Sequence, residues 1–191
     1  TTMGHFLLDL GVVDERTISA HAKESEETGK GDSFKYAWVM DNIKDERARG
    51  ITIDLAFKKF ETPKYFFTLI DAPGHRDFVK NMITGASEAD CAVLVLSAKE
   101  GETDTAIAPG GQAREHAFLL KTLGVKQIIV AINKMDDSKF SEDAFNAAKQ
   151  KGEGLVKSVG YKIDEVPFVP VSGWTGENLV KKSENMPWYK G

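Results

Sequence analysis

Four apolar runs that end on polar residues constrain the fold of this chain more than any other feature. They are "YFFTLID" (65–71), "CAVLVLS" (91–97), "QIIVAIN" (127–133) and "VPFVPVS" (166–172). Near-continuous apolar runs of this length are typical of parallel strands that are covered on both faces. A further strand is expected at 51–60, where apolar and more polar residues alternate, as they do in a half-buried strand.

Helical patterns separate these strands. We expect helices over 33–50, 112–124 and 141–160, the last with Ser141 as its N-cap and Gly160 at its end. Alternating strands and helices predict an α/β fold of three layers with right-handed crossovers. In such folds ligands bind beyond the carboxyl ends of the strands.

The composition indicates one globular domain of 191 residues with a net charge of -4. This charge argues against a surface that grips nucleic acid by charge alone, but leaves a local contact open. Cys91 is the only cysteine, so no internal disulfide can form, and we expect it to pack in the core. No apolar stretch approaches the ~18 residues of a membrane span, and the first residues lack the pattern of a signal peptide. A reducing cytosol suits such a chain.

Asp71 ends the first apolar run and begins the motif "DAPGH". A carboxylate at the end of a buried strand needs a cation or strong hydrogen-bond donors, and Mg²⁺ beside a phosphate is a fitting partner. The backbone N–H of Gly74 can approach an anion closely, and His75 could orient or polarise a water molecule. The alternative is that "APG" is only a turn, with Asp71 as its cap.

The third run ends in "NKMD", from Asn133 to Asp136. The Asp136 carboxylate could accept two N–H bonds from the edge of guanine, a donor pair that adenine lacks. The stem of Lys134 could lie over the base, and Asn133 could tie the loop to its neighbours. The alternative is a chance Asn-Lys-x-Asp turn, because these residues are common in turns.

Two further segments could complete such a site. In "SGW" (172–174) a small residue and a glycine would let backbone N–H groups meet guanine O6, although alone it would be a Ser-Gly turn. In "DERARGITID" the hydroxyl of Thr52 could ligate Mg²⁺ while its N–H meets a terminal phosphate. Such a loop would order with triphosphate and relax after hydrolysis. Otherwise Thr52 simply faces solvent on an edge strand.

Together these motifs resemble the translational GTPases, and more narrowly the G domain of the archaeal and eukaryotic elongation factor 1-alpha family. The resemblance covers essentially all 191 residues. It is carried by "ERARGITID", "DAPGHRDFVKNMITGASEADCAVLVLSA", "GGQAREHAFLLKTLGVKQIIVAINKMD", "PFVPVSGWTGENL" and "NMPWYKG". It implies an α/β, three-layer P-loop-GTPase-type fold with a mostly parallel sheet, incomplete at both ends.

The resemblance also implies roles for single residues. His75 would be catalytic by positioning the attacking water, Gly74 would sense the γ-phosphate, and Thr52 and Asp71 would hold the metal. The nucleotide-binding residues would be Asp71, Gly74, Asn133, Lys134, Asp136, Ser172, Gly173 and Trp174. GTP or GDP and Mg²⁺ would be bound, and the family delivers aminoacyl-tRNA to the ribosome and lets go when GTP is hydrolysed.

The resemblance further implies a cytoplasmic protein, without membrane contact, that works with a guanine nucleotide exchange factor. Two alternatives stay open. One is a termination or ribosome-rescue GTPase built on the same domain. The other is a non-catalytic fragment that no longer binds nucleotide.

The sequence departs from the family in one motif of consequence. No GxxxxGK[ST] phosphate loop occurs, and the final helix and two β-barrel domains of the family are missing as well. In GTPases of this type the opening strand lies between the strands at 65–71 and 91–97. Each backbone group left unpaired there costs ~1–3 kcal/mol, against a net stability of ~5–15 kcal/mol. We therefore expect residues 1–191 to be a truncated GTP-binding domain that does not bind nucleotide soundly alone. The alternatives to truncation are that a second chain supplies the strand or that the sheet is rearranged.

Overall fold

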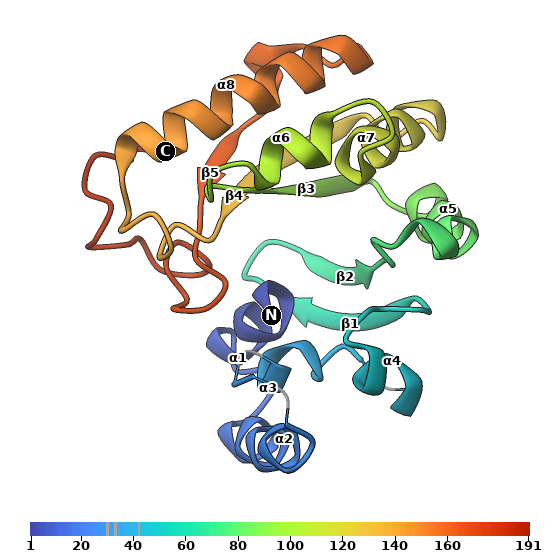
Figure 1. Cartoon of the computed structure of the whole chain (residues 1–191), viewed down its shortest axis with the longest axis vertical. Coiled ribbons are helices and arrows are strands. Elements are labelled where there is room, and N and C mark those ends of the chain that lie inside the picture. The colour runs from blue at the N-terminus through green and yellow to red at the C-terminus, as the bar shows by residue number, and fades with distance from the viewer. Residues whose placement is uncertain (30, 33, 42) are drawn as a thin grey trace. The chain divides into compact units, whose positions relative to one another are not determined.

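A computed structural model describes residues 1–29, 31–32, 34–41 and 43–191 (Figure 1). The chain divides into two compact units, an N-terminal unit, Thr1–Gly85, and a C-terminal unit, Ala86–Gly191. No helix in these described ranges is long and apolar enough to span a membrane.

The N-terminal unit joins a two-stranded sheet to several short helices. Its strands, β1 (Ala56–Glu61) and β2 (Phe66–Asp71), are antiparallel, with Ala56 opposite Asp71 at one end. A small core forms around buried Leu7, Ile18 and Met40. The helices of this unit are α1 (Thr2–Asp9), α2 (Glu15–Glu27), α3 (Phe34–Ala37), α4 (Lys44–Arg49), the 3₁₀ turn η1 (Arg76–Phe78) and α5 (Val79–Ser87), whose last two residues belong to the C-terminal unit.

The single helix predicted over 33–50 is wrong, because α3 and α4 are separate. Ile43, the residue before α4, has extended backbone angles of φ -99° and ψ 136°. The predicted end at Gly50 is confirmed, since this residue is left-handed with φ 72° and caps α4. Two residues of the predicted range, Ser33 and Asn42, lie outside the described residues.

The strand predicted at 51–60 begins only at Ala56. The reason is that the N–H groups of Ile53 and Asp54 donate to the side chain of Glu46 rather than to a strand. The neighbouring run at 65–71 is not covered on both faces, because Phe66 is 89% exposed on β2. Apolar composition alone therefore overestimated the burial of this sheet.

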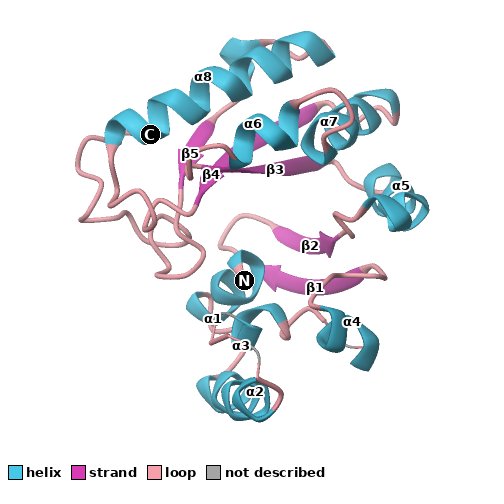
Figure 2. Ribbon diagram, viewed as in Figure 1, coloured by secondary structure: helices cyan, strands magenta, loops and turns pink. Residues whose placement is uncertain are grey.

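The C-terminal unit contains a parallel sheet in the order β3-β4-β5. Its strands are β3 (Cys91–Ser97), β4 (Gln127–Asn133) and β5 (Phe168–Pro170). Three helices, α6 (Glu102–Ile107), α7 (Gln112–Thr122) and α8 (Glu142–Val159), lie along one side of these strands (Figure 2). A short 3₁₀ turn, η2 (Ile163–Glu165), precedes β5. The predicted α/β class with a parallel sheet is confirmed, and both sheets are partial.

Burial alternates along β3. Leu94 and Leu96 are buried, whereas Val93 and Val95 are exposed. Cys91 has the same parity as the two valines and is exposed, so the expectation that it packs in the core is wrong. Strand residues alternate between faces, and the helices of this unit contact only one of them.

The helix caps of the C-terminal unit agree with the sequence. The hydroxyl of Ser141 accepts the N–H of Ala144 at 3.4 Å, and α8 ends at Gly160 with φ 95°. The helix α7 is followed by Gly124 with φ 87°. A left-handed residue at a helix end favours glycine, because the missing Cβ removes the steric penalty.

Candidate functional site

The carboxyl ends of β4 and β5 bring two of the predicted motifs together. These strands are paired in parallel up to Ile132 and Pro170. Beyond that pair, Val171 donates its N–H to the carbonyl of Ile132 at 2.9 Å, and Met135 donates to the carbonyl of Val171 at 3.2 Å. The loop that carries "NKMD" and the loop that carries "SGW" are therefore joined through their backbones.

Side chains lock the same two loops. The hydroxyl of Ser172 donates to the Asp136 carboxylate at 2.6 Å, and the N–H of Gly173 donates to the side-chain oxygen of Asn133 at 2.9 Å. Ser172 is fully buried, and its hydroxyl also accepts the N–H of Thr175 at 3.1 Å. The structure thus assembles four of the residues that the sequence predicts for guanine recognition. Their contact with guanine stays a prediction.

Lys134 pairs with a residue that the sequence analysis did not name. Its ammonium donates to the Glu102 carboxylate at 2.7 Å, and Glu102 is the first residue of α6. This hydrogen bond is the main reason that the pKa of Glu102 lies below its ordinary value. The backbone of Lys134 is left-handed, with φ 64°, a conformation that is uncommon and costly for a residue with a Cβ. Trp174, on the adjoining loop, is 39% exposed.

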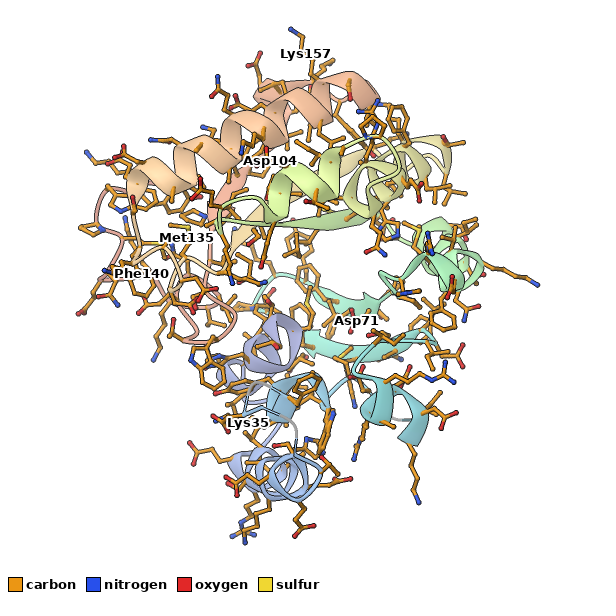
Figure 3. All side chains as sticks on the ribbon, viewed as in Figure 1. Lys35, Asp71, Asp104, Met135, Phe140 and Lys157 are labelled. Carbon is orange, nitrogen blue, oxygen red and sulfur yellow. The ribbon has the colours of Figure 1, made fainter. Side chains whose placement is uncertain are left out.

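The loop after Asp136 is anchored on the core. Met135 is fully buried, and the indole N–H of Trp188 donates to the carbonyl of Phe140 at 3.1 Å. Figure 3 labels Met135 and Phe140 on this loop, which leads from β4 towards α8. Phe140 and its neighbour Lys139 both have positive φ, 58° and 54°. Tertiary contacts therefore hold this loop in a conformation that isolated residues disfavour.

In the N-terminal unit, Asp71 is the last residue of β2 (Figure 3). Burial raises its pKa to about 6. The nearby carboxylates of Asp41 and Glu46 add to this rise. Asp41 and Glu46 are themselves buried. A cation would stabilise the charged form of Asp71 in these surroundings.

The other residues predicted for phosphate and metal binding have separate surroundings. The hydroxyl of Thr52 donates to Asp41 at 3.3 Å. The ring of His75 accepts the N–H of Asp77 at 3.2 Å and so caps η1. Gly74 is exposed, with nothing within 4 Å of the position that a Cβ would occupy. Within the described ranges, no hydrogen bond or ion pair joins Thr52, Asp71 and His75.

The oxygen atoms of these residues could supply only part of the coordination shell of a Mg²⁺ ion. Carboxylate and hydroxyl oxygens, such as those of Asp71 and Thr52, are the ligand type that Mg²⁺ prefers, and the ion usually takes one or two protein ligands together with water and phosphates. No group of three or more His, Cys, Asp or Glu able to hold a metal occurs among the described residues. These residues fit an ion that arrives with a phosphate ligand.

Residues 1–186 match the family model described as "Elongation factor Tu GTP binding domain". The chain belongs to this family. The resemblance inferred from the motifs is thereby confirmed.

The similar proteins of the elongation factor Tu GTP-binding family include two archaeal ones. The elongation factor 1-alpha of Cenarchaeum symbiosum (strain A) is 85% identical over 191 residues, which are 100% of this chain and 44% of that protein. That of Ignicoccus hospitalis is 57% identical over 193 residues, covering 100% of this chain and 43% of that protein. The chain therefore spans less than half the length of these relatives.

Solved structures agree with the family. Sup35 complexed with GDP has a TM-score of 0.69 and 30% identity, covering 100% of this chain and 38% of that one. The Saccharomyces cerevisiae Ski7 GTPase-like domain bound to GTP has a TM-score of 0.79 and 25% identity, covering 100% and 44%. The predicted GTPase-type fold is confirmed by this likeness.

Sequence reasoning missed several residues that shape these loops, among them Glu46, Glu102 and Trp188. Glu102 directly follows Gly101 at a helix start, a position where an acidic residue is ordinary. Glu46 lies three residues after Ile43, a spacing found in capping boxes, but Ile43 has no polar side chain to complete the signature. Trp188 carried no local signal, because its partner Phe140 is 48 residues away.

Proposed function

We propose that this chain is the GTP-binding part of a translational GTPase of the elongation factor 1-alpha type. The whole protein delivers aminoacyl-tRNA to the ribosome, and GTP hydrolysis drives its release. The observation that carries the proposal is the lock of Asn133 and Asp136 onto the loop of Ser172 and Gly173. It stands in a chain that is 85% identical to an archaeal elongation factor 1-alpha.

Guanine selection is assigned to the C-terminal unit. The hydroxyl of Ser172 donates to one oxygen of the Asp136 carboxylate at 2.6 Å and so restrains the group. A carboxylate has about four acceptor sites, so the same group can still take the two N–H donors of guanine. Lys134 would exchange Glu102 for the face of the base, with Trp174 and the Gly173 backbone beside it.

Phosphate and metal binding are assigned to the N-terminal unit. Bound Mg²⁺ would neutralise the charge that develops on the phosphates. Asp71 would accept hydrogen bonds from the water shell of the ion, and the hydroxyl of Thr52 would ligate it. The backbone N–H of Gly74 would meet the terminal phosphate. His75 would leave its capping contact with Asp77 to position the attacking water.

The proposal extends to the protein as a whole. The 191 residues form its GTP-binding domain, and two β-barrel domains complete it. Its partners are aminoacyl-tRNA, the ribosome and a guanine nucleotide exchange factor, in the cytoplasm and away from membranes. An elongation factor is favoured over a termination or rescue factor because the chain is 85% identical to an elongation factor 1-alpha.

The experiment replaces Asp136 by Asn in the full-length protein that carries this chain. Titration calorimetry with GDP and with xanthosine diphosphate, in the presence of Mg²⁺, reads out the base preference. Hydrogen bonds to a charged group contribute roughly 1.5–3 kcal/mol each. We therefore expect GDP affinity to fall by about 100-fold or more and xanthosine diphosphate affinity to rise.

Asp137→Asn is the matched control, because Asp137 is the exposed neighbour in the same loop. It should leave both affinities unchanged. Unaltered GDP binding by Asp136→Asn would show that the guanine assignment is wrong. Absence of binding by the unsubstituted full-length protein would contradict the proposed function itself and favour the non-catalytic alternative.

A further inference from the structure

Glu46 is a buried carboxylate that the proposed function does not use. It is 3% exposed and lies in α4. One of its oxygens accepts the N–H of Ile43 at 3.1 Å, and the other accepts those of Ile53 and Asp54, both at 3.0 Å. Buried carboxylates are costly unless they are hydrogen-bonded, and these bonds compensate the charge. They also bring residue 43 and residues 53–54 together at the Glu46 side chain.

Asn81 holds the same segment from α5. Its amide donates to the carbonyl of Ile53 at 2.8 Å and to the Asp54 carboxylate at 2.9 Å. The backbone N–H of Ile53 thus meets Glu46 while its carbonyl meets Asn81. The short segment Ile53–Asp54 is fixed from two elements, α4 and α5.

Thr52 comes directly before this segment and is held by a weaker contact. Its hydroxyl reaches Asp41 at 3.3 Å, which is longer than the ~2.5–3.0 Å usual for an O–H donor. Asp41 is also tied to α4, because the Arg47 side chain donates to its carbonyl at 3.0 Å. Ile53 is therefore firmly anchored by its backbone. The side chain of Thr52, in contrast, has one long hydrogen bond.

We propose that Glu46 and Asn81 form a clamp on Ile53–Asp54 that positions Thr52. The clamp fixes the backbone directly after Thr52. The hydroxyl of Thr52 can then exchange Asp41 for a nucleotide-bound cation while residues 53–54 stay in place. Glu46 and Asn81 act through Thr52 and touch neither nucleotide nor metal, so they are positioning residues. This inference rests on the proposed function for the role of Thr52, but the clamp itself does not depend on it.

The first arm of the test measures the clamp directly. Amide hydrogen exchange of Ile53 and Asp54 is followed in the full-length protein for Glu46→Gln and Asn81→Ala, with Glu27→Gln and Asn146→Ala as exposed controls. Glutamine has one oxygen and one NH₂ group, so it cannot accept the N–H groups of Ile43, Ile53 and Asp54 together as the carboxylate does. Loss of local protection should speed exchange at Ile53 and Asp54 by about 10-fold or more in the test variants. Unchanged exchange would overturn the clamp.

The second arm separates positioning from general stability. Thr52 is expected to engage the cation only when a γ-phosphate is present. Both test variants should therefore weaken binding of a non-hydrolysable GTP analogue by about 10-fold while GDP affinity changes little. Equal loss for both nucleotides, or for neither, would overturn the positioning role. If the unsubstituted protein binds no nucleotide, the proposed function fails, and the exchange arm still decides the clamp.

Discussion

The candidate residues of the two units differ in how far the protein joins them to one another. In the C-terminal unit, Asn133, Asp136, Ser172 and Gly173 are joined by direct hydrogen bonds. In the N-terminal unit, Thr52 and His75 each contact a different neighbour, Asp41 and Asp77. The comparison shows that the protein itself holds the predicted base-binding residues together. In the N-terminal unit the Asp71 carboxylate lies near those of Asp41 and Glu46, so a bound cation would stabilise its charged form.

The largest effect on stability is expected at Asp71, in the N-terminal unit. Since its pKa is raised to about 6, the folded state binds more protons than the unfolded state between the ordinary value of 3.8 and about 6. Stability is therefore greatest below the unfolded value and is lost as pH rises through this window. The cost at neutral pH is on the order of 3 kcal/mol.

Asp71→Asn should remove this cost. In urea denaturation of the chain without nucleotide, the variant should be more stable than the original near pH 7 and equal to it near about pH 4. The exposed Asp45→Asn is the control. The same substitution should weaken Mg²⁺-dependent nucleotide binding. A variant that is less stable at neutral pH would show that the charged form of Asp71 already has a stabilising partner.

A smaller effect is expected at Ser172, in the C-terminal unit. Ser172→Ala leaves the N–H of Thr175 and the Asp136 carboxylate without their shared partner in a fully buried position. We expect the free energy of unfolding to fall by about 1–3 kcal/mol and GDP affinity to fall with it. Denaturant unfolding and calorimetry measure the two quantities.

Ser158→Ala is the control for this prediction, because Ser158 is an exposed serine on α8 whose hydroxyl donates to the carbonyl of Leu155. It should change stability little and GDP affinity not at all. Normal GDP binding by Ser172→Ala would mean that Asp136 is oriented without Ser172, and the contrast between the residues of the two units would disappear.

The smallest effect is expected at the ion pair of Lys134 and Glu102. Both side chains are more than a third exposed, and exposed pairs are worth ~0–1 kcal/mol. Glu102→Gln should therefore alter stability by less than about 1 kcal/mol, and less still at high salt. Because Lys134 would be released from its acidic partner, GDP affinity should be unchanged or slightly higher. A marked loss of affinity would show instead that Glu102 positions Lys134 for the base.

Parts of this fold were predictable because their signals are local. The bounds of the apolar runs at 91–97 and 127–133 agree with β3 and β4, and the Ser141 and Gly160 caps agree with α8. The meeting of "NKMD" with "SGW" followed from parallel strands that end at one edge. The break between α3 and α4 and the late start of β1 were missed, because both depend on the hydrogen bonds of Glu46.

By itself the sequence determined the strands β3 and β4, where the best-capped helix ends and which polar residues follow strands. It could do so because periodicity, capping and turn chemistry involve residues a few positions apart. Only the tertiary structure decided which face of β3 is buried, that Lys134 pairs with Glu102, and that Glu46 holds Ile53 and Asp54. Those outcomes depend on which donors and acceptors become neighbours once distant segments pack, and no local pattern encodes that choice.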